Sequence, residues 1–161
     1  MNKINKLLKL DPSIKMLISI GNPGEKYAHT RHNAGHILLD ILLDKNIVSR
    51  NDYKIFKSSD FMNKSGEFVS KKLNYYKFKV ENLLIIHDDL DLKIGEYKLQ
   101  FAKGPKVHNG LLSIEKHLRS QGFWRLRVGI ENRSAESHES GMDYVLNNFT
   151  SEEKLKLAEI I

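Results

Sequence analysis

The stretch MLISIGNPGEKYAHTRHNAGHILLDILL, residues 16–43, decides the fold of this 161-residue chain. It opens with an apolar, β-prone run at Met16–Ile20 and closes with apolar residues at the spacing of an amphipathic helix. The turn between these runs holds three histidines, two asparagines and a proline. A strand that leads through a turn into a helix is the first unit of an α/β fold, so we expect these polar residues at one end of a sheet strand.

The rest of the chain continues this alternation. The candidate strands are Met16–Ile20, Tyr53–Phe56, Leu83–His87, Glu96–Phe101 and Trp124–Ile130. The candidate helices are His32–Asp44, Ser65–Lys77, Gly110–Arg119 and Ser151–Ile161, the last with Thr150 as its N-cap and Glu153 completing a capping box. This order predicts an α/β, single-domain, three-layer sandwich, in which a mostly parallel mixed sheet carries helices on both faces.

Composition limits the class of protein. The chain has no cysteine, which excludes disulfides, thiolate metal sites and a cysteine nucleophile. No apolar run reaches the roughly 18 residues of a membrane span, and MNKINKLLKL lacks the apolar core of a signal peptide. We therefore expect one cytoplasmic domain over residues 1–161, without membrane contact and with residues 1–12 as a disordered extension.

The net charge of +6 is unevenly distributed. Residues 1–128 carry 23 Lys and Arg against 13 Asp and Glu, whereas residues 129–161 carry 3 against 7. Such a basic surplus attracts polyanions by releasing their counterions, which makes nucleic acid a candidate partner. A lysine-rich solubilising surface explains the charge equally well, so charge alone does not decide between the two readings.

Three polar clusters follow predicted strands or begin predicted helices. They are GNPG at 21–24, IIHDDLDL at 85–92 and KGPKVHNG at 103–110. If the strands are parallel, Asn22, His32 and the Asp88–Asp89 pair share one rim of the sheet, where open α/β sheets bind ligands. The third cluster begins the next helix and can reach the same rim.

A histidine paired with an aspartate on such a rim suits general-base chemistry. The carboxylate fixes one ring nitrogen as a donor and leaves the other free to accept a proton from water, while asparagine amides can hold an oxyanion. Neither GxSxG nor HExxH occurs in the chain, so water activated by histidine fits better than a serine nucleophile or a zinc protease. Two other interpretations stay open: Asn22, Gly24, Thr30 and Asn109 as ordinary turn and cap residues, and the Asp88, Asp89 and Asp91 triplet as a divalent-metal site.

Five motifs in order resemble bacterial peptidyl-tRNA hydrolase. They are GNPGEKYAHTRHNAG at 21–35, FMNKSG at 61–66, HDDLDLKIG at 87–95, HNGLLSI at 108–114 and FWRLRVGI at 123–130. The resemblance covers about Met16 to Phe149. It implies an enzyme that hydrolyses the ester between a peptide and tRNA, releasing tRNA for reuse in translation. It also implies no cofactor and no metal, and we expect a monomer whose partner is peptidyl-tRNA.

The resemblance assigns roles by matching position. His32 matches the catalytic base, Asp88 the carboxylate that supports it, and Asn22 the residue that favours N-blocked substrates. The positions expected to contact the peptidyl-tRNA end are Tyr27, Phe61, Met62, Asn63, His108 and Asn109. The positions expected to meet tRNA phosphates are Lys103, Lys106, Arg125 and Arg127.

The sequence departs from the family pattern in three places. Only 31 positions separate His32 from Asn63, so a hairpin before FMN is expected to be shortened or missing. Pro105 and Val107 stand where the family has flexible glycines, and relatives continue through more helix beyond the position of Ile161. These departures leave open a non-catalytic RNA-binding relative of the same fold, while a metal-dependent phosphoesterase fits His32 and Asn63 poorly.

Overall fold

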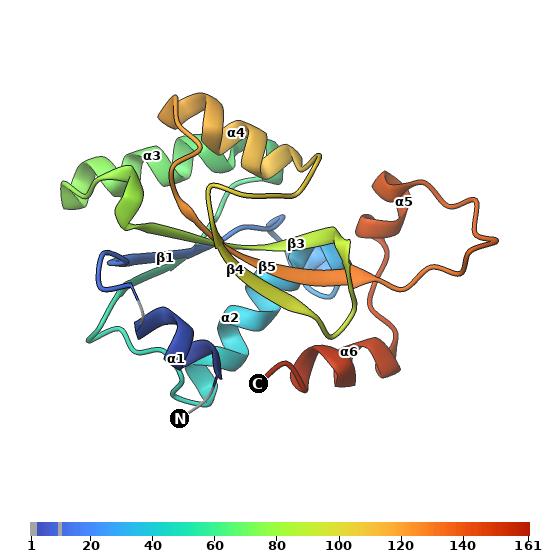
Figure 1. The fold of residues 1–161 in the computed structure, drawn as a ribbon. Coiled ribbons are helices and arrows are strands. Elements are labelled where there is room, and N and C mark those ends of the chain that lie inside the picture. The colour runs from blue at the N-terminus through green and yellow to red at the C-terminus, as the bar shows by residue number, and fades with distance from the viewer. Residues whose placement is uncertain (1–2, 10) are drawn as a thin grey trace.

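A computed structural model describes residues 3–9 and 11–161, which form a five-stranded sheet between two layers of helices (Figure 1). The strands are β1 (Met16–Ser19), β2 (Lys54–Lys57), β3 (Leu83–Lys93), β4 (Tyr97–Phe101) and β5 (Trp124–Glu131). The α-helices are α1 (Lys3–Lys9), α2 (Ala34–Asp44), α3 (Ser65–Tyr76), α4 (Asn109–Leu118), α5 (Gly141–Leu146) and α6 (Ser151–Ala158). Short 3-10 turns are η1 (Glu25–Tyr27), η2 (Arg31–Asn33), η3 (Met62–Lys64) and η4 (Val80–Asn82).

The strand order is β2-β1-β3-β5-β4, and every pair is parallel except β4 with β5. Helices α3 and α4 cover one face of the sheet, and α1, α2 and α6 lie on the other (Figure 1). This confirms the predicted α/β sandwich with a mostly parallel mixed sheet. The carboxyl ends of β1 and β3 therefore meet at one rim, as the positions of the polar clusters require.

Strand alternation divides the core between the two faces. Leu17, Leu84 and Ile86 face the layer of α2 and α6, whereas Met16, Ile18 and Ile85 face α3 and α4. Both faces of the central strands are buried, which is why those strands read as continuous apolar runs.

Two glycines set how closely the helix layers approach their neighbours. A Cβ on Gly35 in α2 would lie 2.4 Å from the carbonyl oxygen of Ile86, so this helix rests directly on β3. A Cβ on Gly66 in α3 would lie 2.1 Å from the carbonyl oxygen of Ser113 in α4. Side chains at these positions would push α2, which directly follows the η2 turn that carries His32, or the helix pair α3–α4, out of place.

Three elements differ from the sequence expectation. Strand β3 runs on to Lys93 instead of ending at His87, because Asp88 and Asp89 pair with Val128 and Gly129 of β5. Residues 3–9, expected within a disordered extension, form α1, and its Ile4 and Leu8 are buried in the core. Helix α5 was not expected; Ser140 caps it by accepting the Asp143 amide.

Strand β2 lies at the edge of the sheet, and the described residues hold no strand outside it. Only residues 58–61 connect β2 to η3, which agrees with the expected shortening of the hairpin before FMN. The expected strand at 53–56 is shifted by one residue, since Lys54 and Lys57 pair with Met16 and Ser19. Across the described residues, the structure has no helix of the length and hydropathy that crossing a bilayer requires.

Candidate active site

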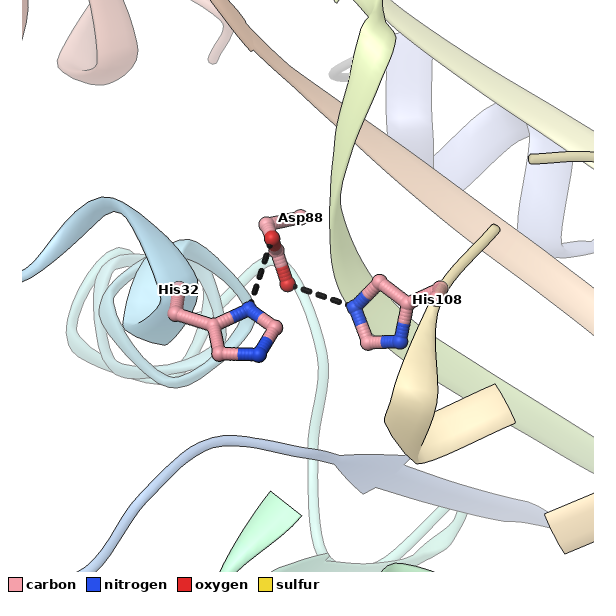
Figure 2. A group of neighbouring side chains, drawn as sticks. All are labelled: His32, Asp88 and His108. Atoms are coloured by element: carbon pink, nitrogen blue, oxygen red, sulfur yellow. Dashed lines mark hydrogen bonds and ion pairs between the residues drawn. The ribbon is translucent and has the colours of Figure 1, made fainter. Parts of the chain in front are cut away.

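Three side chains from separate elements meet at the rim of β3 (Figure 2). His32 comes from η2, Asp88 from β3, and His108 from the position that caps α4. Oδ2 of Asp88 lies 2.8 Å from Nδ1 of His32, and Oδ1 lies 2.7 Å from Nε2 of His108. We call these three residues the Asp88 cluster.

The hydrogen bonds around the cluster determine its tautomers. Nδ1 of His108 accepts the amide N–H of Leu111, so the proton of the neutral ring lies on Nε2 and is donated to Asp88. Nδ1 of His32 donates to the second oxygen of Asp88, which leaves Nε2 of His32 as a proton acceptor. The carboxylate thus orients two imidazoles, and the one from η2 keeps a free basic nitrogen.

Burial and charge act in opposite directions on this cluster. Burial lowers the pKa of His32, but the adjacent Asp88 charge and hydrogen bond outweigh it and raise the pKa above its ordinary value. Burial would raise the pKa of Asp88, yet the two imidazoles bring it far below its usual range. His87, whose ring lies edge-on at 5.2 Å from His108, is fully buried, and its pKa falls to about 3, so it adds no charge at neutral pH. Asp88 therefore stays ionised and strengthens His32 as a base.

The GNPG turn is held against the same rim by asparagine contacts. The main-chain N–H of Asn22 donates to Oδ1 of Asn33 at 2.8 Å, and Nδ2 of Asn33 donates to the Asn22 carbonyl at 2.9 Å. Oδ1 of Asn22 accepts the Met62 amide at 2.9 Å, so η3 is fixed to the turn. With that oxygen occupied, the Nδ2 group of Asn22 is the donor left for a ligand.

Two adjoining pockets of about 340 and 330 Å³ open beside His32. The first reaches Asp88 and His108, and the second reaches Asn22, Phe61, Met62 and Asn63; Asn109 lines both. Tyr27 lies next to them, with its ring 6.1 Å from that of Phe61 in an edge-on contact. The structure thus gathers the expected catalytic and substrate-contacting residues around one cleft.

Comparisons with known proteins agree with this geometry. The family model described as peptidyl-tRNA hydrolase matches residues 16–161. The chain belongs to the peptidyl-tRNA hydrolase family. It is 38% identical to the peptidyl-tRNA hydrolase of Geotalea uraniireducens over 92% of this chain and 85% of that protein, and 37% identical to that of Brevibacillus brevis over 92% and 86%. The crystal structure of peptidyl-tRNA hydrolase from Acinetobacter baumannii superposes with a TM-score of 0.79 at 31% identity, covering 91% of this chain and 82% of that one.

Part of the cleft comes from residues that the sequence analysis did not single out. Met142, Val145 and Leu146 of α5 line one or both pockets, and Met142 is 74% exposed. The pair Ser140 and Asp143, three positions apart before an apolar run, is a helix-start signal that the sequence did contain. The position of α5 over the cleft, in contrast, follows only from tertiary packing.

The four basic residues expected to meet phosphates fall into two groups. Lys103 and Lys106 are exposed on the loop that leads to α4. Arg125 is 2% exposed and pairs with Glu115 at 2.8 Å, and Arg127 lies 2.6 Å from Asp89 and 2.7 Å from Gln100. The loop lysines therefore face solvent, whereas both arginines are held by partners within the fold.

The aspartate triplet does not converge on one point. Asp88 contacts two imidazoles, Asp89 contacts Arg127, and Asp91 accepts the amide of Lys106. Among the described residues, the Asp88 cluster is the group that could hold a metal ion. Its ring nitrogens and carboxylate oxygen lie within 4.8 Å of one another. A metal there would have to replace both hydrogen bonds that orient the imidazoles.

Proposed function

We propose that this chain hydrolyses the ester of peptidyl-tRNA with His32 as general base, releasing tRNA for reuse in translation. The observation that carries the proposal is the free Nε2 of His32, on a ring oriented by buried Asp88, beside a cleft of a peptidyl-tRNA hydrolase family member. No cofactor is needed for this chemistry.

The proposed reaction proceeds by a water attack. Nε2 of His32 takes a proton from water, whose oxygen adds to the ester carbonyl carbon, while Asp88 stabilises the imidazolium that forms. The negative charge on the carbonyl oxygen is held by amide donors at the cleft, of which Asn22 Nδ2 and the side chains of Asn63 and Asn109 are candidates. The ester C–O bond then breaks, and His32 returns its proton to the ribose oxygen of the leaving tRNA.

The cleft suits a peptide joined to a nucleotide. Exposed Phe61, packed edge-on by Tyr27, and buried Met62 supply apolar surface for the peptide. Following the family resemblance, we assign Asn22 the recognition of N-blocked substrates. Nε2 of His108 is occupied by its hydrogen bond to Asp88 at 2.7 Å. The proposed contact of His108 with substrate is therefore made by the part of its ring that lines the first pocket.

We propose the exposed Lys103 and Lys106 as phosphate contacts. Both lie on the loop whose Pro105 and Val107 line the first pocket of the cleft. Arg125 and Arg127 retain that role only if substrate displaces their acidic partners. All residues of the proposed mechanism belong to one chain, which supports action as a monomer. The substrate is a product of translation, which supports a cytoplasmic location.

Hydrolysis of peptidyl-tRNA by the purified chain tests the proposal directly. We expect His32→Ala to lower kcat by roughly 10²–10⁴ while tRNA binding stays nearly unchanged. His138→Ala, which removes an exposed histidine that lines neither pocket, should leave both unchanged. A parent chain that binds tRNA but does not hydrolyse the ester would instead favour the non-catalytic RNA-binding relative.

A further inference from the structure

A separate pocket of about 620 Å³ lies on the other side of the GNPG turn from the cleft. It is enclosed by that turn, by one face of α2 and by the end of β2. The polar side chains that line it are Asn22, His29, Asn33, His36, Asp40, Lys57, Ser58 and Lys154. Its aliphatic part comes from Ile37 and Ile41. Of these residues, the proposed hydrolysis uses Asn22 alone.

Ser58 is the residue that indicates a ligand site in this pocket. The residue is 5% exposed, and its amide donates to the carbonyl of Ser19 at 2.9 Å, so its place at the end of β2 is fixed. Its hydroxyl, in contrast, is buried and has no hydrogen-bond partner among the described residues. Leaving a buried hydroxyl unpaired costs about 1–3 kcal/mol, and such groups are uncommon in folded proteins.

His36 stands beside Ser58 in a fixed orientation. Its Nδ1 lies 2.7 Å from Oγ of buried Ser19, and its ring packs so tightly on Gly21 that a Cβ there would lie 2.6 Å from Cδ2. Burial, followed by the charge of Lys57, lowers the pKa of His36 to about 4, so the ring is neutral at pH 7. The inner wall of the pocket is therefore rigid, polar and uncharged.

The outer wall is basic. Lys57 and Asp40 form an exposed ion pair at 2.7 Å, which leaves no net charge from these two residues. Lys154 adds an ammonium group, and no ion pair of its side chain occurs within residues 3–9 and 11–161. The pocket is thus lined by Ser58, whose buried hydroxyl is unpaired among the described residues, and it carries a net positive charge at its mouth.

We propose that this pocket is a second ligand site, which takes a small molecule bearing an oxyanion, either a phosphate or a carboxylate. The oxyanion accepts the hydroxyl proton of Ser58 and lies near the ammonium groups of Lys57 and Lys154. The aliphatic side chains of α2 contact the rest of the molecule.

The occupant also contacts the back of the turn that carries Asn22. Asn33 lines this pocket, and its amide makes both hydrogen bonds that hold the main chain of Asn22. Asn22 in turn accepts the Met62 amide on the cleft side at 2.9 Å. The chemical shift of the Met62 amide, on the cleft side of the turn, should therefore report ligand binding in the second site.

Titration of the intact chain with inorganic phosphate and, separately, with acetate, followed by ¹H–¹⁵N NMR, tests the site. We expect saturable shifts of the Ser58, Asn33 and Met62 amides with one or both anions, and the stronger anion identifies the oxyanion class. Ser58→Ala should weaken binding about tenfold, because it removes a hydrogen bond to a charged group. This variant loses no hydrogen bond of the fold, so its spectrum and unfolding midpoint should otherwise match the parent.

Lys57→Gln provides the charge test. It should also weaken binding, whereas Lys71→Gln, which removes an equally ion-paired lysine from α3, should not. Shifts confined to the loop at 103–108, equal binding by the parent and Ser58→Ala, or equal losses in the two lysine variants would each overturn the proposal. None of these readouts depends on ester hydrolysis, so the outcome is independent of the proposed function.

Discussion

Replacing Asp88 by asparagine separates the orienting role of this carboxylate from the shape of the cleft. Asp88 is 2% exposed and receives hydrogen bonds from two imidazoles, at 2.8 Å from His32 and 2.7 Å from His108. Asparagine keeps the volume, but it has a single acceptor oxygen and carries no charge. One of the two imidazoles must then face an amide NH₂ group, which favours the opposite tautomer.

The expected magnitude follows from the bond that is lost. A hydrogen bond to a charged group contributes about 1.5–3 kcal/mol, and here it acts on the imidazolium that forms as His32 takes the proton. The loss of this hydrogen bond alone should lower the rate constant kcat by about 10- to 150-fold, with little change in tRNA affinity. An added loss is expected wherever the wrong tautomer of His32 dominates.

The same substitution should change the pH profile in a defined direction. The base is active when neutral, so kcat/KM is lost as the pH falls through the pKa of His32, which Asp88 raises above its ordinary value. Removing the carboxylate lowers that pKa, because it takes away both the charge and the hydrogen bond that favour the imidazolium, so the acid limb should move to lower pH. The variant is thus slower at neutral pH but retains its activity further into acid.

Single-turnover hydrolysis of peptidyl-tRNA between pH 5 and 9 measures both effects. Asp44→Asn, which removes an exposed carboxylate at the end of α2, is the matched control and should keep the parent profile. An Asp88→Asn enzyme with the parent rate and the parent acid limb would refute the assignment of His32 as a base supported by this carboxylate.

Three further predictions concern substrate, metal and stability. Lys103→Ala should weaken all tRNAs alike and reduce the slope of log affinity against log salt by roughly one unit, while Lys45→Ala at the end of α2 should not; equal slopes for the two would remove the loop from the tRNA surface. EDTA should leave hydrolysis unchanged, and loss restored by a divalent ion would instead place a metal at the Asp88 cluster. Glu153→Ala should destabilise the fold by about 3–5 kcal/mol in urea unfolding, because it leaves the buried Arg31, paired at 2.9 Å, without its counter-charge; a change below about 1 kcal/mol would contradict this.

The sequence was sufficient for the architecture because the periodicity of apolar residues is a local property. Buried parallel strands read as apolar runs, and α2, α3 and α4 read as helices, each within a few residues of its observed bounds. The capping box of Thr150 and Glu153 is also local, and both of its hydrogen bonds are present. The motifs likewise indicated the family, since their order along the chain is itself sequence information.

Tertiary structure decided which side chains act together. Nothing near His108 in the sequence indicates that its Nε2 meets Asp88, 20 positions away; that contact depends on how α4 packs over β3. Arg125 and Lys103 are both basic residues in the sequence, but the sheet register buries Arg125 beside Glu115 and leaves Lys103 in solvent. Strand β3 continues past His87 only because β5 supplies partners for its aspartates. These outcomes depend on contacts between segments far apart in the chain, and such contacts exist only after the layers have packed.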